Sequence, residues 1–169
     1  AEMYPGVDGD VKYKEGMAVG YRHTDRLKPA RVNFAFGHGL SYTTFMLGKA
    51  TLSDKTLPAD GNVRVTVPVT NTGDRAGAEV VQVYVRDVKS SVERPLKELK
   101  AFKKVIVAPG RTVDVELTLD KSAFAYYNAD AKRWEVEPGK FEILVGTAAD
   151  AISSRLSMSV DAADLAWKD

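Results

Sequence analysis

Cysteine is absent from the 169 residues of this sequence. Without thiols the chain has no disulfide, no cysteine nucleophile and no thiolate ligand for a metal. The redox compartment stays open, because a chain without cysteine suits either side of a membrane. Histidine is scarce as well: only His23 and His38 are present, with no third ligand near them, so we expect neither a metal site nor a cofactor.

An excess of charge of one sign is also lacking. The 24 Lys and Arg residues balance 23 Asp and Glu, for a net charge of +1. A dedicated nucleic-acid-binding protein would carry a basic excess. No apolar run approaches the roughly 18 residues of a membrane span, and the first residues lack the charged-then-apolar order of a signal peptide. We therefore expect no nucleic-acid partner and no membrane partner.

The first forty residues differ in composition from the rest, because they mix scattered glycines with aromatic residues and show no helix or strand period. The glycines are Gly6, Gly9, Gly16, Gly20, Gly37 and Gly39, and the aromatics include Tyr4, Tyr13, Tyr21, Phe34 and Phe36. Such a segment forms no core of its own, so we predict an extended arm that lies against another surface, inside or outside this chain. Since the sequence begins Ala-Glu-Met rather than with an initiator Met, we also expect a processed or excised piece of a longer protein.

From about Ser41 the pattern changes to short strands separated by turns. In residues 62–71 four valines alternate with other residues, as a half-buried strand requires, and residues 81–85 and 113–119 repeat this period. We predict that the first two of these strands pair as a hairpin with a long loop. Pro68 cannot donate a backbone hydrogen bond, which predicts an edge or bulge position for it.

The remaining elements complete an all-β fold. Residues 121–126 are expected to form one helical turn capped by Asp120, and with residues 42–52 as the first strand the chain contains about seven strands. Because no helix is available for crossovers, we predict a seven-stranded antiparallel sandwich of the immunoglobulin or fibronectin-III-like type, with an extended, mostly irregular N-terminal arm. We place the arm and linker at residues 1–40, the sandwich at 41–162 and a C-terminal tail at 163–169.

Two pairs of carboxylates have the spacing of neighbours on one strand face. Glu135 and Glu137 are two residues apart, which puts their Cα atoms about 6–7 Å apart. Side chains that project in parallel from a strand do not flank a glycosidic bond from opposite sides, so we expect a solvated face rather than an acid/base pair. The same holds for Asp114 and Glu116, which lie opposite a Val/Leu face.

Other candidate groups also have structural explanations. The segment Gly37-His38-Gly39 opens no helix, so we interpret it as a flexible turn and not as a phosphate site. The serine pairs at 90–91 and 153–154 lack the motif of a serine nucleophile. The lysines of residues 97–104 are expected to protect an exposed strand edge against pairing.

Aromatic side chains offer one binding hypothesis. Tyr126, Tyr127 and Trp134 form a sugar-stacking platform if they are exposed, but a single Trp in a sandwich lies more often in the core or in an interface. We therefore favour the core for these side chains. No catalytic constellation is assembled by the residues considered so far.

Six stretches, taken in order, resemble the C-terminal end of family 3 glycoside hydrolases, the β-glucosidase family. They are residues 13–22 (YKEGMAVGYR), 36–45 (FGHGLSYTTF), 69–73 (VTNTG), 79–85 (EVVQVYV), 94–100 (RPLKELK) and 136–139 (VEPG). The resemblance runs nearly from one end of the chain to the other. It implies that this chain is the tail of an α/β-sandwich domain followed by a fibronectin-III-like domain.

The resemblance further implies a three-part enzyme, with an aspartate nucleophile on a (β/α)-barrel and an acid/base glutamate on the α/β domain. Such an enzyme hydrolyses terminal, non-reducing β-D-glucosyl residues with retention, through a covalent intermediate. The motif of neither catalytic carboxylate is present here, so no catalytic residue is carried over and no substrate-binding residue is assigned. The implied partners are the barrel and α/β domains, as the same or a separate chain, and the β-glucoside that they bind; the family favours secretion or the periplasm.

A second hypothesis stays open beside this one. The aromatic residues and the neutral composition also suit a stand-alone carbohydrate-binding or adhesion module. A titration with cello-oligosaccharides separates the two hypotheses, because a binding module gives a saturable change in tryptophan fluorescence and a scaffold does not.

Overall fold

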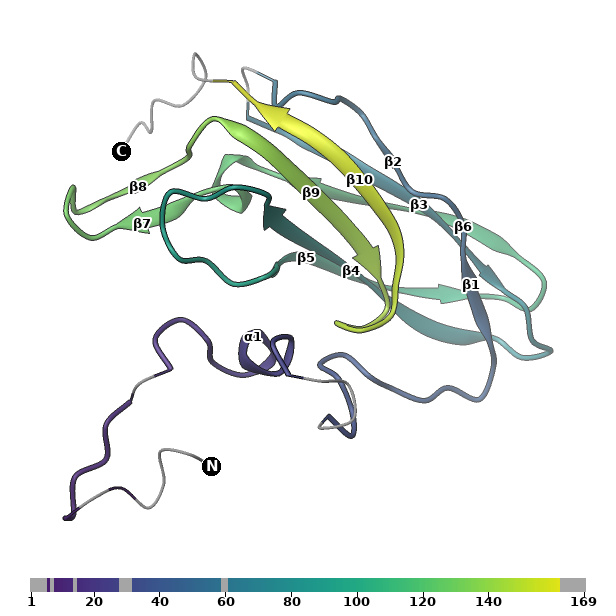
Figure 1. The fold of residues 1–169 in the computed structure, drawn as a ribbon. Helices are drawn as coiled ribbons and strands as arrows, with labels where there is room; N and C mark the ends of the chain where they lie inside the picture. Colours follow the sequence, from purple (N-terminus) through teal and green to yellow (C-terminus); the bar gives the residue numbers. More distant parts are fainter. Residues whose placement is uncertain (1–5, 7, 14, 28–31, 59–60, 162–169) are drawn as a thin grey trace.

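A computed structural model describes residues 6, 8–13, 15–27, 32–58 and 61–161 of the protein. They form a two-layer antiparallel β-sandwich with an arm along one side (Figure 1). The first layer contains β1 (Phe45–Leu47), β2 (Thr51–Leu52), β3 (Val63–Asn71) and β6 (Thr112–Leu119). The second contains, in spatial order, β10 (Ile152–Val160), β9 (Gly139–Gly146), β4 (Gly77–Asp87) and β5 (Glu98–Val107). The all-β sandwich predicted from the sequence is confirmed.

The core lies between the two layers and is built from alternating apolar residues. In β3 the four valines are fully buried while the residues between them are more accessible, which is the period-2 pattern read from the sequence. Valines of β4 and aliphatic residues of β9 face them from the other layer, and Phe124 packs edge-to-face on Phe141 with ring centroids 5.3 Å apart. The strands therefore belong to one continuous hydrophobic core.

The predicted hairpin of residues 62–71 and 81–85 is wrong. β3 pairs with β1, β2 and β6, whereas β4 pairs with β5 and β9 in the other layer. The two valine faces point at each other across the core and are not neighbours in one sheet. Asn71, fully buried, stabilises the crossing between layers, because its side chain donates to the carbonyls of Arg75 and Val107 and accepts from Gly73 N and Thr43 Oγ1.

Pro68 lies in a central strand and not at an edge, but the neighbouring strand is irregular opposite it, as the predicted alternative of a bulge requires. On one side Pro68 is paired with Asp114 of β6; on the other, the neighbouring strand is interrupted between β1 and β2. There Gly48 N donates to Pro68 O at 2.8 Å, and the missing proline N–H needs no partner. This interruption splits the single strand predicted for residues 42–52, so each of the two layers holds four strands.

Beyond the two layers, a short turn and a hairpin complete the described structure. Asp120 caps a 3-10 turn, Lys121–Ala123, by accepting from Ser122 N at 2.8 Å, as the sequence predicted for a helical turn here. β7 (Tyr126–Asn128) and β8 (Arg133–Glu135) pair as a separate two-stranded sheet that projects from one end of the sandwich (Figure 1). Helix α1 (Tyr21–Thr24) is one turn of the arm. Within the described ranges, no helix has the length and apolar character needed to cross a membrane.

Candidate functional site: the arm and the charged loop beside it

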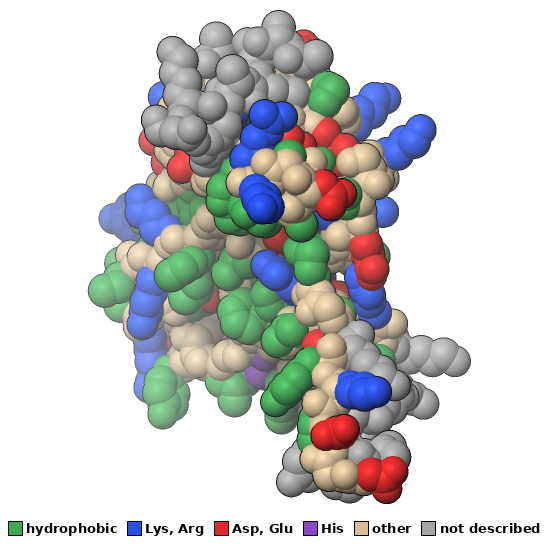
Figure 2. Space-filling view, turned by 90° about the vertical axis from the view of Figure 1, so that its left-hand side faces the viewer, with side chains coloured by type: hydrophobic (Ala, Val, Ile, Leu, Met, Phe, Trp, Pro, Cys, Tyr) green, Lys and Arg blue, Asp and Glu red, His purple; other side chains and the backbone are tan. Residues whose placement is uncertain are grey.

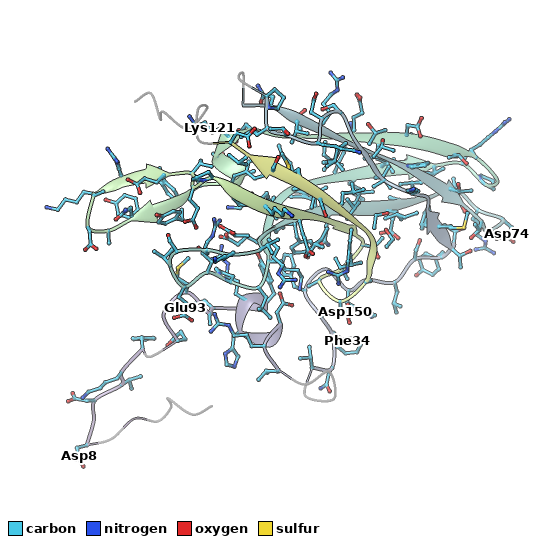
Figure 3. The ribbon with its side chains drawn as sticks, turned by 45° about the horizontal axis from the view of Figure 1, so that its top comes forward. Asp8, Phe34, Asp74, Glu93, Lys121 and Asp150 are labelled. Atoms are coloured by element: carbon cyan, nitrogen blue, oxygen red, sulfur yellow. The ribbon has the colours of Figure 1, made fainter. Side chains whose placement is uncertain are left out.

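The arm docks on the outer face of the layer that contains β4 and β9. Tyr21 packs against Tyr84 with ring centroids 5.9 Å apart, and its hydroxyl accepts a 2.7 Å hydrogen bond from Leu99 N. Further along, Ala149 N donates to Phe36 O at 2.8 Å, and Figure 3 shows the labelled Phe34 and Asp150 close together in this region. The sequence predicted that the arm lies against another surface, and part of that surface belongs to this chain.

The backbone at Gly37 approaches the side chain of Gln82 closely, which explains why this position is a glycine. Gly37 has a φ of 85° and lies so near Gln82 that a Cβ atom there would meet Gln82 Nε2 at 2.1 Å. Gln82 is itself held, because its amide donates to Thr147 O at 3.0 Å and its carbonyl oxygen accepts from the Tyr84 hydroxyl. Burial raises the pKa of this tyrosine, so the hydroxyl stays a donor. Glycine is therefore required at position 37, because a residue without a side chain can adopt this backbone angle and lie this close to Gln82.

Ion pairs connect the arm to the loop of residues 88–97 and to the start of β5. Lys97 Nζ lies 2.6 Å from Asp25 Oδ2, and both side chains are nearly buried. Arg22 reaches Glu98 at 3.4 Å, and Arg26 reaches Glu93 at 3.1 Å, on the part of the loop labelled in Figure 3. The outer pair is exposed and contributes little, whereas the inner pairs are shielded from water and fix the position of the arm.

Arg94 is the centre of this charged loop. Its guanidinium is 5% exposed, donates to Glu98 Oε2 at 2.7 Å and to the carbonyls of Phe124 and Ala125, and lies 3.5 Å from Asp87 Oδ2. It is also 5.9 Å from the centre of the Tyr126 ring. Sequence reasoning missed this role. The available signal was an arginine four residues before a glutamate at the start of an apolar strand.

Two carboxylates near Arg94 have opposite pKa shifts. Burial, together with the neighbouring Glu137, raises the pKa of Asp87, although the Lys89 backbone N–H and Arg94 oppose this. Burial acts in the same sense on Glu137, but hydrogen bonds from Ser91 and Ser90 outweigh it and lower the pKa of that carboxyl. Burial also lowers the pKa of Lys100, whose Nζ lies 3.7 Å from Glu98. These groups hold the loop together.

The carboxylate pairs considered in the sequence do not form an acid/base pair. Glu135 accepts from Asn128 Nδ2 at 2.8 Å and Arg133 Nε at 2.7 Å, and these bonds lower its pKa. Glu137 points instead to Ser90 and Ser91. Asp114 and Glu116 are exposed on the outside of β6, which is the solvated face predicted for them. Glu137 has Asp87 as a carboxylate neighbour, but both are held by donors of the loop that follows β4.

Histidine and serine residues are likewise used locally. His38 stacks on Phe34, with ring centroids 4.9 Å apart, and His23 is exposed on α1. Ser153 donates to Val145 O and Ser154 accepts from Ala50 N. Among the described residues, no group of three or more His, Cys, Asp or Glu side chains is placed to hold a metal ion.

Trp134 lies at the surface, so the favoured core position is wrong for it. The indole and the Tyr127 ring form an edge-to-face pair across β7 and β8, with centroids 5.7 Å apart, and are 49% and 53% exposed. The reason is that these strands form a sheet of their own outside both layers. Tyr126 points the other way, towards Arg94.

Exposed apolar side chains are concentrated on the arm. Tyr13 is 84% exposed, and Leu40 and Tyr42 are each 95% exposed. Others in the same segment are Val11, Met17, Val19, Phe34 and Phe36. Figure 2 shows hydrophobic side chains gathered in the lower part of the molecule, the side on which the arm lies. A soluble protein rarely exposes so many large apolar groups together unless something binds them.

Comparisons with known proteins agree with this geometry. Residues 79–149 match the family model of the fibronectin type III-like domain. The chain is 49% identical over 158 residues to thermostable β-glucosidase B of Acetivibrio thermocellus, a match that covers 94% of this chain and 21% of the relative. It is 48% identical to a β-glucosidase of Rhizobium radiobacter over 94% of this chain and 19% of that one.

A solved structure is similar over the whole chain. The family 3 β-glucosidase of Bifidobacterium adolescentis superposes with a TM-score of 0.83 at 36% identity, covering 99% of this chain and 24% of that chain. The chain thus spans about a fifth of the length of the relatives that it matches. Both the sandwich and the arm are inside the match, because it covers almost the entire chain.

Proposed function

From the premise that this chain is a C-terminal fragment of a family 3 β-glucosidase, we propose that it is the structural part of a retaining β-glucosidase. The observation that carries this proposal is the match of 94% of the chain to only 21% of an enzyme with that name. In the whole enzyme the reaction is hydrolysis of terminal, non-reducing β-D-glucosyl residues. The nucleophile and the acid/base group then lie on segments outside this chain.

The local role of the carboxylates supports this assignment. A retaining glycosidase needs two carboxyl groups about 5 Å apart across the sugar. Glu135 accepts from Asn128 of its own hairpin, Glu137 accepts from Ser90 of the loop that follows β4, and Asp87 is shielded beside Arg94. These groups stabilise the fold, and we assign no catalytic or substrate-binding residue to the chain.

Residues 1–40 are, in this proposal, the end of the preceding α/β domain, and residues 41–162 are the sandwich. The exposed Tyr13, Leu40 and Tyr42 are then covered by the rest of the enzyme. Since Tyr21 and Phe36 are anchored on the sandwich, the arm connects the two domains physically. Such a connection contributes to catalysis by holding the catalytic groups in register.

A chimeric enzyme tests this function. This chain replaces the matched 158-residue region of Acetivibrio thermocellus β-glucosidase B, and hydrolysis of an aryl β-glucoside is measured. We expect activity from the chimera, none from the isolated chain, and none from the relative with that region deleted. A folded chimera without activity, or activity of the isolated chain, contradicts the proposal.

One observation favours a second function, the binding of a glycan by the sandwich alone. Tyr127 and Trp134 present two half-exposed rings at the surface of the β7–β8 hairpin, and aromatic faces pack on the apolar faces of sugars. Titration of the isolated chain with cellohexaose tests it by tryptophan fluorescence. A saturable signal that is lost in Trp134→Ala supports glycan binding, and no signal leaves the scaffold function alone.

A further inference from the structure

The two outer faces of the sandwich differ in character. On the layer with β3 and β6 the outward residues of these two strands are polar apart from Pro68, and Met46 of β1 is an exposed apolar residue beside them. Arg64, Thr66 and Thr70 alternate with the buried valines of β3, and Thr112, Asp114, Glu116 and Thr118 are the outward residues of β6. This is the pattern of a face that meets water. On β5, by contrast, Phe102 and Ile106 point outward and are 69% and 77% exposed.

The arm covers only half of the outer face formed by β4, β5 and β9. Tyr84, Leu99 and Leu144 are packed beneath Tyr21 and Ala35. The other half begins at Gln82, which lies under Gly37 and is the register partner of Phe102. Residues opposite each other in this register share a face, so Phe102 is directly beside the covered half.

Further along the same face lie Val80 with its partner Lys104, and Ala78 with its partner Ile106. The chain after the arm reaches the first residue of β4, where the Ser41 hydroxyl is 3.3 Å from where a Cβ of Gly77 would be, on the face that Gly77 shares with the buried Val81. Leu40 and Tyr42, each 95% exposed, flank this point. Phe102, Lys104 and Ile106 therefore form an uncovered area on the outer face, which begins beside Gln82 and which we call the β5 patch.

We propose that the β5 patch is a second contact with the rest of the enzyme, separate from the N-terminal half of the arm, and that it binds an apolar surface carrying a carboxylate opposite Lys104. This inference rests on the proposed function. Two observations favour the rest of the enzyme as the surface that covers the β5 patch. About four fifths of the matched relatives lies outside this chain, and the β5 patch is continuous with the arm, whose exposed residues face the same partner.

The charge of the β5 patch argues against a second copy of this chain as the occupant. A twofold contact through this patch would bring the Lys104 side chains of the two copies onto the same interface. Like charges at an interface disfavour that contact. Lysines on an edge strand also oppose strand-to-strand pairing.

Cysteine labelling tests the proposal, because this chain has no cysteine of its own. Ile106→Cys is introduced into the isolated chain and into the chimera, and its rate of alkylation is followed by peptide mass spectrometry. Met46→Cys is the matched control, since Met46 is 57% exposed on β1 and its register partner is Thr70, on the polar face. Both positions are exposed, so neither substitution is expected to prevent folding.

We expect alkylation at position 106 to be at least about tenfold slower in the chimera than in the isolated chain, with equal rates at position 46. If position 106 is alkylated at the same rate in the isolated chain and in an active chimera, the β5 patch is not a contact with the rest of the enzyme, and the proposed function still holds. An inactive, folded chimera counts against the proposed function itself. If alkylation of the isolated chain slows with its own concentration to the rate in the chimera, a second copy is the occupant and the proposal is wrong.

Discussion

At the scale of single residues, the largest effect is expected from Arg94. This side chain is 5% exposed and neutralises the shielded carboxylates of Asp87 and Glu98 while satisfying two carbonyls. Removing one partner from a buried ion pair leaves an uncompensated charge. The Arg94→Met variant should therefore lose about 3–5 kcal/mol of unfolding free energy in urea denaturation.

The matched control for this variant is Arg133→Met. Arg133 also pairs with a glutamate, Glu135, at 2.7 Å, but its side chain is 70% exposed. An exposed pair contributes little to stability, so Arg133→Met should lose much less unfolding free energy than Arg94→Met. If both variants lose the same unfolding free energy, burial of the ion pairs of Arg94 does not increase their contribution to stability.

Asp87 gives the stability an unusual dependence on pH. Its pKa is raised above the ordinary 3.8, so the folded state holds this proton more tightly than the unfolded state. Stability from this group is present at low pH and is lost as pH rises from about 4 through the raised pKa. Glu137, whose pKa is lowered from 4.5, acts in the opposite direction at lower pH.

Replacement of Asp87 by Asn should remove the part of the decrease in unfolding free energy with rising pH that this carboxyl causes. Urea midpoints measured between about pH 3.5 and 6.5 are then expected to decrease less with rising pH in Asp87→Asn than in the wild type. Asp114→Asn, at an exposed position, should leave the shape unchanged. Parallel curves for Asp87→Asn and the wild type would mean that this carboxyl titrates alike in the folded and unfolded states.

At the scale of elements, alternating valines identified the buried face of β3 and of β4 but not the partner of either strand. Periodicity specifies which side of a strand meets the core, and both strands meet the same core from opposite layers. The partner depends on long-range contacts: the buried Asn71 turns the chain from one layer to the other. For the same reason Pro68 looked like an edge residue, although the gap between β1 and β2 accommodates it.

The arm as an element should depend on Tyr21. Its ring packs on Tyr84 and Phe36, and its hydroxyl accepts from Leu99 N. In Tyr21→Ala we expect trypsin to cleave after Arg22 and Arg26 at least about tenfold faster, because local opening exposes the arm. Tyr13→Ala, at a position 84% exposed, serves as the control. If the cleavage rate is unchanged in Tyr21→Ala, residues other than Tyr21 hold the arm on the sandwich.

At the scale of the whole molecule, the sequence predicted the sandwich, the solvated position of Asp114 and Glu116, and an arm that needs another surface. The solvated face predicted for Glu135 and Glu137 is wrong, because hydrogen bonds hold both carboxylates in partly buried positions. It did not predict that Tyr84 and Gln82 of this chain provide part of that surface, because neither the glycines nor the aromatics of the arm encode a partner. The surface position of Trp134 was missed since composition does not show that residues 126–135 leave both layers as a hairpin. The charged loop around Arg94 depends on contacts between segments up to 76 residues apart.

Deletion of residues 1–40 should leave a folded but weakened sandwich. Tyr84, Leu144 and Ala149 lose their cover, and the cost is on the order of 3 kcal/mol for the apolar area returned to water. We expect a lower urea midpoint, increased binding of the dye ANS, and a far-ultraviolet circular dichroism spectrum that still reports β-structure. An unchanged midpoint without dye binding would mean that the arm contributes no stability to the sandwich.

The anchoring of Tyr21 and Phe36 on the sandwich also limits how the proposed enzyme can move. A connection between domains normally acts as a tether whose slack sets the range of their motion. Here the chain is fastened to the second domain well before the first strand of that domain begins, at Leu99 and again at Ala149. These two contacts restrain the connection on the side of the sandwich, so we expect the sandwich to move less relative to the proposed domain before it than a free tether would allow.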